Sequence, residues 1–437
     1  MGSGRTISVA GPSIVLVYGV IGFFLFFVMR AMGELLLSNL KYKSFTDFSE
    51  DLLGPWAGFA VGWTYWFCWV VTGTADIIAI SGYIGYWFPH LTTWIPAIAF
   101  ILLLVVLNLV SVNLFGEMEF WFCSIKIVAI VGLIFAGIYL VATGFVSPAG
   151  HKAALSNMWA LEGGVFPKGL MGFFAGFQIA LFAFVGIELV GTTAAEAKDP
   201  EINLPRAVNS VPFRIVFFYM FALIAIMSIT PWNSLDPNGS PFVHVFDLVG
   251  IGIAASLINF VVLTSAASSA NGGIYSTSRM LYGLSLYGVA PKLFRRLSTH
   301  NVPANGLLFS CFCLLLGSAM LIIMPSVMEA FTIITTISAT LFIFVWSLIL
   351  FAYLAYAKKR PELRAKSKFK LPGGVYMVYA CLTFFAFVVT LLFFEEITRE
   401  ALLVTPIWFG ILAIGYLFAR KTYDPTKRSH HVEEEKA

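Results

Sequence analysis

The 437-residue sequence has few charged residues. Asp, Glu, Lys and Arg make up only 11% of it, against roughly a quarter in an average soluble domain. Hydrophobic residues make up 59%, and the mean hydropathy is +0.87, so there is too little charge to cover the surface of a soluble protein of this size. This scarcity excludes a cytosolic enzyme, a nucleic-acid-binding protein and a disulfide-stabilised secreted domain. The composition predicts a protein that crosses a membrane many times.

Cysteine and histidine are also scarce. The five cysteines lie within apolar runs without metal-ligand spacing, so we interpret them as small core residues. They are Cys68, Cys123, Cys311, Cys313 and Cys381. The six histidines lie in loops, near span edges or in the tail, and they are His90, His151, His244, His300, His430 and His431. We therefore expect no metal site, no cofactor and no enzyme active site. The sequence also contains no acidic ring or carbonyl-rich filter typical of a passive channel.

Eleven apolar stretches approach the length of about 20 residues that a helix needs to cross a bilayer. They are continuously apolar and do not alternate, which excludes a β-barrel. The predicted spans are Pro12–Leu36, Ala57–Phe88, Trp94–Val112, Trp121–Thr143, Gly169–Thr192, Pro212–Thr230, Val245–Ala270, Gly306–Met324, Met328–Ala355, Gly374–Phe394 and Leu402–Phe418. The longest gap, around Asn271–Pro303, contains an amphipathic stretch, Ser276–Tyr287, and no soluble domain fits between the spans. We predict one transmembrane domain over residues 1–437, with residues 419–437 as a cytoplasmic tail.

Basic residues predict the orientation, because cytoplasmic loops are enriched in Lys and Arg. With the C-terminus in the cytoplasm, 22 of the 27 basic residues lie inside, 4 lie outside, and Lys126 lies within a span. Eleven spans then place Met1 outside, although residues 1–10 contain no apolar segment to carry them across. We therefore expect a further helix upstream of Met1.

Charged residues within hydrocarbon cost about 2.5–3.5 kcal/mol each on insertion scales, so each needs a partner or a purpose. Asp76, Lys126 and Glu188 lie within predicted spans. Desolvation disfavours the Lys126 ammonium, so this residue either exchanges a proton during a cycle or stays charged and links helices. Arg30 and Glu34, four residues apart near the end of the first span, are interpreted as an interfacial pair.

The fifth predicted span is rich in glycine. Gly186 and Gly191 flank Glu188 and weaken the helix there. In secondary transporters, helices interrupted at mid-membrane present N-terminal ends to anionic groups and carbonyls to cations, which suits a zwitterion. The alternative is that the glycines serve helix packing alone. The hydroxyl-rich stretch Thr264–Asn271 likewise either lines a substrate path or joins helices.

Several motifs resemble those of amino acid permeases in the amino acid–polyamine–organocation superfamily. They are Arg30-Ala-Met-Gly-Glu34, Phe182-Ala-Phe-Val-Gly-Ile-Glu188, the segment Glu196–Ala207 with its two prolines, Ser276–Leu281 and Gly288–Pro291. The similarity extends over essentially the whole chain. It implies an all-α fold of two inverted five-helix repeats followed by two helices, with residues 1–10 as the remnant of the first helix and its loop. It also implies proton-driven import of a small neutral amino acid, such as glycine, D-alanine or D-serine, across a bacterial inner membrane.

The resemblance also implies roles for individual residues. Phe182 falls where the family has an aromatic side chain that covers the substrate, and Lys126 falls where proton-coupled relatives keep a lysine. Glu188, just beyond the unwound segment, is a second candidate for coupling. The expected substrate-binding residues are Phe182, Ala183, Phe184, Val185, Gly186, Thr72, Asp76 and Ser268.

Two alternatives stay open. The first is a permease for aromatic or basic amino acids, and Asp76 favours the basic version if it faces the pocket. The second follows from the first helix: either the start codon is misassigned, or the protein is truncated and does not transport. The expected partners are the amino acid, protons and membrane lipid, with the loop Lys358–Lys370 next to anionic lipid, and no nucleic acid.

Overall fold

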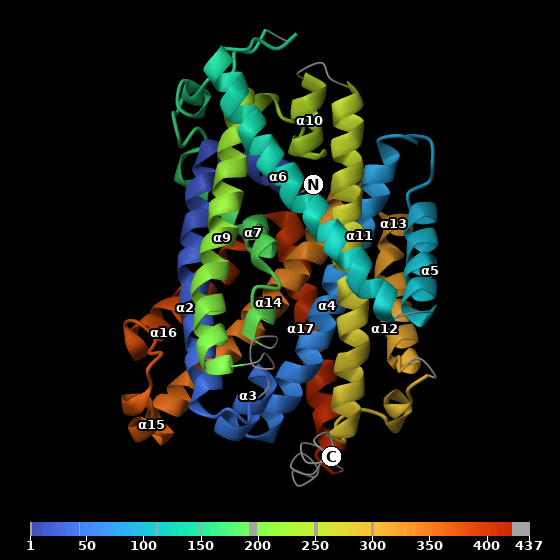
Figure 1. Ribbon diagram of the computed structural model, residues 1–437, viewed down its shortest axis with the longest axis vertical. Coiled ribbons are helices and arrows are strands. Elements are labelled where there is room, and N and C mark those ends of the chain that lie inside the picture. Colours follow the sequence, from blue (N-terminus) through green and yellow to red (C-terminus); the bar gives the residue numbers. More distant parts are fainter. Residues whose placement is uncertain are drawn as a thin grey trace.

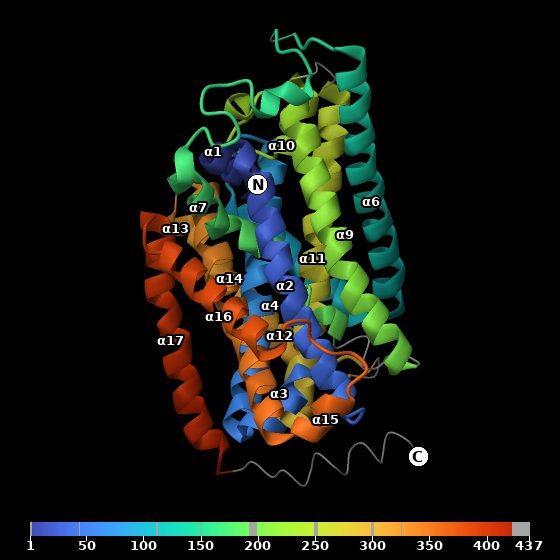
Figure 2. The same cartoon turned by 90° about the vertical axis from the view of Figure 1, so that its left-hand side faces the viewer.

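The protein is a bundle of helices whose long members run mostly along one axis in the computed structural model (Figures 1 and 2). The structure describes residues 2–42, 44–110, 112–148, 150–191, 199–248, 252–298, 301–324 and 326–421. These ranges contain no β-strand beyond one isolated bridge between Val146 and Lys152. The predicted all-α class is therefore confirmed.

The described residues form ten helices that are long and apolar enough to cross a membrane, and a shorter apolar helix covers Trp94–Leu109. Each of the eleven predicted spans falls on one of them, which makes the chain a multi-pass membrane protein. The helices are α1 (Gly2–Ala10), α2 (Ile14–Ser38), α3 (Phe45–Leu53), α4 (Pro55–Gly85), α5 (Trp94–Val110), α6 (Val112–Thr143), α7 (Gly169–Ala180), α9 (Pro200–Ile229), α10 (Pro241–Leu248), α11 (Gly252–Leu286), α12 (Ala304–Ser318), α13 (Met320–Ile323), α14 (Val327–Lys359), α15 (Pro361–Lys366), α16 (Gly374–Leu391) and α17 (Glu396–Ala419).

Several predicted spans have different limits in the structure, among them those of α9 and α11. Helix α9 begins at Pro200 rather than Pro212, because a proline in the first turn lacks only an N–H that has no helical partner. Helix α11 continues to Leu286, so the stretch Ser276–Tyr287 belongs mostly to a long helix rather than to a separate segment. Two of its hydroxyl groups are satisfied within the helix, since Thr277 and Ser278 each donate to the carbonyl three residues before.

Helices α4 and α14 lie at the centre of the bundle. Of the most apolar stretch of each, 72% and 78% is buried inside the protein, against 11% for α6 and 22% for α17. Figure 2 shows α6 and α17 at opposite edges of the molecule. Because α4 packs against both α11 and α14, polar side chains on the inner faces of these helices meet away from lipid.

The fifth predicted span is interrupted. Helix α7 ends at Ala180, a short 3₁₀ turn, η3 (Leu181–Phe184), follows, and residues 185–188 form turns. Gly186 has a φ of +93°, a conformation that side-chain-bearing residues rarely adopt. The predicted helix break is confirmed. Residues 192–198, which include Thr192 and Glu196 of the expected span and motif, lie outside the described residues.

Helix α1 packs against α7 and thus covers the interrupted helix. It is separated from α2 by a turn at Gly11, which has a φ of +61°. A Cβ at Gly11 would lie 2.4 Å from the ring of Pro167, so glycine is required there on two counts. This turn lets the short N-terminal helix take its own direction above the cavity described next.

Candidate functional site

A cavity of about 350 Å³ lies where the interrupted helix faces α1, α4, α9 and α11. Its volume falls within the range of roughly 300–1,000 Å³ common for small-molecule sites. It is lined by Gly2, Ser3, Tyr18, Asp76, Ala79, Tyr83, Ile179, Phe182, Ala183, Tyr219, Ala222, Leu223, Phe242, Val262, Ser265, Ala266, Ser269 and Phe331. The lining is mostly apolar, with a few hydroxyl groups and one carboxylate.

Three of the predicted substrate-binding residues line this cavity: Asp76, Phe182 and Ala183. Asp76 comes from α4, and one of its oxygens, Oδ2, is buried without a hydrogen-bond partner among the described residues. Phe182 packs edge-on against the ring of Phe331, with 6.1 Å between ring centroids. These two rings form part of the apolar wall of the cavity. The Asp76 carboxylate is the charged group among the residues that line the cavity.

Phe184, Val185 and Gly186 do not line the cavity, although they belong to the interrupted segment. Phe184 is buried beneath it, because its ring packs against Tyr18 and Tyr219 with centroid separations of 5.6 Å. At Gly186 a Cβ would lie 3.3 Å from the indole of Trp69. These residues therefore shape and support the site instead of forming its surface.

Glu188 follows the turn and has no exposed surface. Its two oxygens accept hydrogen bonds from Tyr65 Oη at 3.0 Å and Trp346 Nε1 at 3.2 Å. Tyr65 belongs to α4 and Trp346 to α14, so the carboxylate joins the interrupted segment to the two central helices. Such a buried group is costly to disturb, since its donors would be left unsatisfied.

The hydroxyl-rich end of the seventh predicted span both lines the cavity and joins helices. Ser265 and Ser269, four residues apart on α11, line the cavity. Ser268 faces elsewhere and accepts a hydrogen bond from Lys126 Nζ at 3.1 Å, which joins α11 to α6. Asn271 likewise accepts from Asn108 of α5 at 2.7 Å. Helical periodicity explains this division between faces.

Lys126 lies near the cavity without lining it. Its ammonium is close enough to interact electrostatically with Asp76, and the hydroxyl of Ser269 hydrogen-bonds the same carboxyl group. Thr72, by contrast, forms a 2.8 Å hydrogen bond with Ser338 of α14 and does not line the cavity. The structure therefore brings Lys126, Ser268 and Asp76 into one neighbourhood and leaves Thr72 as a link between α4 and α14.

Three tyrosines of the cavity wall, Tyr18, Tyr83 and Tyr219, were not predicted from the sequence. The hydroxyl of Tyr219 donates to the carbonyl oxygen of Ala183 at 2.7 Å, which holds a backbone group of the interrupted helix from α9. A tyrosine within an apolar span could have indicated this contact, because a buried tyrosine hydroxyl group usually has a hydrogen-bond partner. The Phe331 ring gave no signal of this kind.

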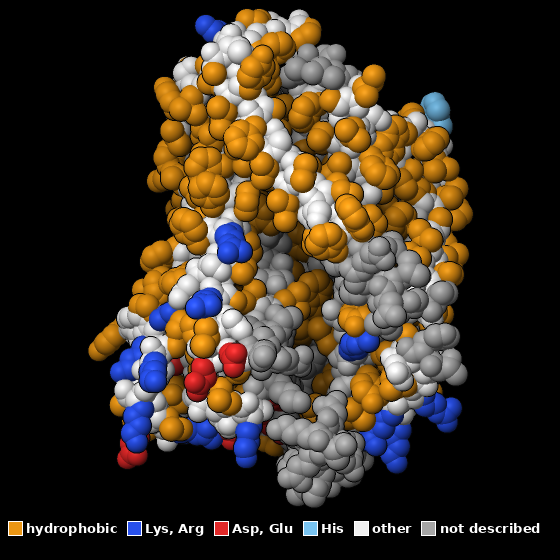
Figure 3. Space-filling view, viewed as in Figure 1, with side chains coloured by type: hydrophobic (Ala, Val, Ile, Leu, Met, Phe, Trp, Pro, Cys, Tyr) orange, Lys and Arg blue, Asp and Glu red, His pale blue; other side chains and the backbone are white. Residues whose placement is uncertain are grey.

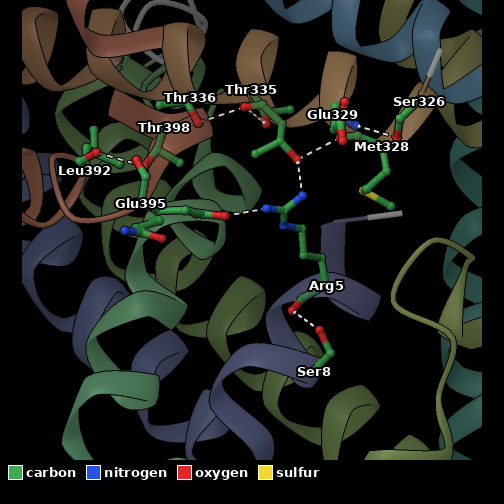
Figure 4. A network of polar contacts seen from close by, with 12 residues as sticks. Arg5, Ser8, Ser326, Met328, Glu329, Thr335, Thr336, Leu392, Glu395 and Thr398 are labelled. Atoms are coloured by element: carbon green, nitrogen blue, oxygen red, sulfur yellow. Dashed lines mark hydrogen bonds and ion pairs between the residues drawn. The ribbon is translucent and has the colours of Figure 1, made fainter. Parts of the chain in front are cut away.

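Above the cavity, Arg5 attaches α1 to other helices (Figure 4). Its guanidinium pairs with Glu395, in the connection between α16 and α17, and its Nη1 donates to Thr332 of α14 at 3.4 Å. Because Gly2 and Ser3 of the same short helix line the cavity, this ion pair holds the cover of the site in position. Within the described ranges, no group of three or more His, Cys, Asp and Glu side chains is placed to hold a metal ion.

Comparison with known proteins agrees with this architecture. The amino acid permease family matches residues 1–429. The D-serine/D-alanine/glycine transporter of Escherichia coli (strain K12) is 65% identical over 421 residues, covering 96% of this chain and 89% of that protein. In Bacillus subtilis (strain 168), the amino-acid permease AapA is 48% identical over 432 residues, covering 99% and 91% of the two chains. The probable threonine/serine transporter YbxG is 40% identical over 416 residues, covering 95% and 89%. The chain therefore belongs to the amino acid permease family and is a membrane transporter.

Proposed function

We propose that the protein is a proton-coupled symporter that imports small neutral amino acids, among them glycine, D-alanine and D-serine, across a bacterial inner membrane. The single observation that carries the proposal is the cavity at the interrupted helix, which combines one carboxylate with apolar walls. The printed name of the E. coli relative supports these substrates.

The cavity suits a small zwitterion. Asp76 offers an unpartnered carboxylate oxygen to an ammonium group, and a charge-assisted hydrogen bond of this kind is stronger than a neutral one. Gly2 and Ser3 of α1 line the same cavity, and the Ser3 hydroxyl group is a hydrogen-bond donor for the substrate carboxylate. A small apolar side chain then lies against the rings of Phe182 and Phe331.

Lys126 is the group that we propose for proton coupling. It lies between α6 and α11, hydrogen-bonded to Ser268, and interacts with the Asp76 carboxyl group. If this lysine gains and loses a proton beside Asp76, which pairs with the substrate ammonium, the charge of the site changes during the cycle. Glu188 satisfies both its oxygens structurally, so we assign it to holding the interrupted helix.

The test is uptake of radiolabelled glycine into proteoliposomes with and without an imposed proton gradient. We expect accumulation only when the interior is alkaline, competition by D-alanine and D-serine, and loss of the gradient dependence in Lys126→Ala while membrane insertion is retained. Lys168→Ala, outside the cavity, serves as the control. Gradient-independent accumulation by the unaltered protein would contradict the coupling, and an unchanged gradient dependence in Lys126→Ala would remove this lysine from it.

A permease for basic amino acids is the second candidate, because the Asp76 carboxylate faces the cavity. In that case a lysine side chain, rather than the α-ammonium, would pair with Asp76. The same liposomes separate the two candidates: competition of glycine uptake by lysine but not by D-alanine favours the basic permease.

We further propose that the C-terminus lies in the cytoplasm, with residues 1–437 as one transporter domain. The excess of Lys and Arg in the loops on that side supports this orientation. Fluorescence of a C-terminal green fluorescent protein fusion, together with inactivity of a C-terminal alkaline phosphatase fusion, is the expected result. The reverse pattern would overturn the orientation.

A further inference from the structure

A second cavity, of about 820 Å³, lies between the end of α14, the short helix α15 and the start of α16. Arg364 and Lys370 line it together with Tyr353, and it shares no residue with the cavity described above. Figure 3 shows that most Lys and Arg side chains on that face of the molecule lie in its lower part, below a surface dominated by hydrophobic side chains. In Figure 1, α15 lies at the same lower end.

Neither basic residue of this second cavity has an acidic partner in an ion pair among the residues that the structure describes. The Nε of Arg364 donates to Tyr353 Oη at 3.3 Å, but within the part of the chain that the structure describes neither Arg364 nor Lys370 forms an ion pair. Arg360, only four residues earlier, pairs with Asp51 at 2.7 Å. Guanidinium groups have five N–H donors, so most of those of Arg364 remain available to a ligand.

The acidic side chain next to Tyr353 is Glu34, whose hydrogen bonds all go to one oxygen, while its Oε1 is buried without a partner among the described residues. Glu34 has no exposed surface, and its Oε2 accepts hydrogen bonds from Tyr353 Oη at 2.9 Å and from the backbone N–H of Leu371 at 2.6 Å. Tyr353 thus stands between this carboxylate and Arg364. Glu34 holds the wall of the second cavity through Tyr353 and Leu371 and is not among the residues that line it.

The first turn of α16 adds further positive potential. Gly373 and Gly374 have φ angles of +74° and +53°, and a Cβ on Gly374 would lie 2.5 Å from an Nη of Arg364. The guanidinium therefore rests directly on the N-terminal end of an 18-residue helix, where the helix dipole is positive. Two cations and a positive helix end in one cavity repel one another unless an anion lies between them.

The position of the second cavity indicates where that anion comes from. Helix α16 is one of the candidate membrane spans, so its first turn lies at a membrane surface. Tyr376 and Tyr379, which also line the cavity, are 87% and 55% exposed. They lie three residues apart on one helical face, and aromatic side chains of this kind are typical of the membrane interface.

We propose that this cavity binds the phosphate group of an anionic phospholipid from the adjacent leaflet. Arg364, Lys370 and the positive N-terminal end of α16 attract the phosphate, and the two tyrosines lie beside the glycerol and the start of the acyl chains. Basic pockets between helices near a membrane surface bind lipid head groups in this way. The proposal concerns lipid alone and does not depend on which substrate the protein transports.

Native mass spectrometry of the delipidated full-length protein tests the proposal, with phosphatidylglycerol, phosphatidylcholine or inorganic phosphate added. We expect retention of phosphatidylglycerol over phosphatidylcholine, and a fall in its affinity of about tenfold or more in the Arg364→Gln, Lys370→Gln double variant, which removes two basic groups near the surface. The matched control is Lys366→Gln, Lys368→Gln, which removes the same charge from exposed residues that do not line the second cavity. The control should bind as the unaltered protein does.

Three outcomes would overturn the proposal. Equal losses in both double variants would indicate attraction to the surface charge alone. Displacement of phosphatidylglycerol by millimolar inorganic phosphate would make the ligand a free anion. Equal retention of phosphatidylcholine would remove the requirement for an anionic lipid. If the Arg364 variant fails to fold, Lys370→Gln against Lys368→Gln answers the same question, because Lys370 holds no structural contact through its ammonium among the described residues.

Discussion

Two acidic side chains within the membrane-spanning region, Glu188 and Asp76, differ in their surroundings. Glu188 has no exposed surface, and each of its oxygens accepts a hydrogen bond from a different central helix. Asp76 lines the cavity, and its Oδ2 has no partner in the described part of the chain. A satisfied buried carboxylate holds structure together, whereas an unsatisfied one beside a cavity is available to a ligand.

The largest expected effect is on stability, at Glu188. Glu188→Ala leaves Tyr65 and Trp346 as buried donors without an acceptor, so we expect the free energy of unfolding to fall by about 3 kcal/mol. Thermal unfolding of the protein in detergent, together with its level in the membrane, measures this. Glu188→Gln is the control, because it keeps one acceptor and should lose clearly less. Equal stability of the alanine variant would remove the structural role.

The next effect is on transport, at Asp76. In Asp76→Asn the substrate ammonium loses a charge-assisted partner, so we expect apparent affinity to fall roughly tenfold or more. Stability should change little, because Asp76→Asn removes a buried charge with one unpartnered oxygen and keeps an oxygen that can bond the hydroxyl of Ser269. Glycine uptake and thermal unfolding of the same preparation separate the two quantities. If Asp76→Asn is destabilised as much as Glu188→Ala, Asp76 has a structural role like that of Glu188, and the proposed difference between the two residues is wrong.

A smaller effect is expected at Gly186, in the turn that precedes Glu188. Gly186→Ala places a Cβ at a φ of +93° and 3.3 Å from the indole of Trp69, which should cost about 1–2 kcal/mol. Gly132→Ala in α6 is the matched control, because no atom lies within 4 Å of its added Cβ. We expect lower thermal stability and slower uptake in the first variant only.

The smallest effect is expected at Tyr219, which supports the cavity from α9. Tyr219→Phe removes the hydrogen bond to the carbonyl of Ala183 but keeps the ring packing against Phe184. The expected loss is about 1 kcal/mol, which corresponds to roughly a fivefold rise in KM for uptake. Tyr18→Phe is the control, because the Tyr18 hydroxyl does not bond Ala183. An equal rise in KM in this variant would contradict a specific role for the hydrogen bond of Tyr219.

The fold followed from the sequence to a large extent, because the apolar length of a span is a local property. The interruption at Gly186 was also predictable, since glycine on both sides of a buried carboxylate disfavours a continuous helix. The extension of α11 to Leu286 was not predicted: its hydroxyl-bearing residues look like a surface segment until neighbouring helices cover them.

The site was predicted less completely, because the direction in which a helical residue points depends on tertiary packing. Asp76 and Phe182 face the cavity as expected, but Phe184 turns beneath it and Thr72 pairs with Ser338 of α14. The hydrogen bond between Lys126 and Ser268 joins residues that are 142 positions apart. A local sequence pattern cannot predict a contact between residues so far apart in the chain.

The pairing of Arg5 with Glu395 joins residues that are 390 positions apart, and it has a mechanical consequence. Helices α16 and α17 lie at the edge of the bundle, yet this ion pair connects them to α1, which covers the cavity. A tilt of α1 that opens the cavity must therefore either move the α16–α17 connection with it or break the ion pair. Two helices at the edge of the bundle thereby affect how readily the site opens.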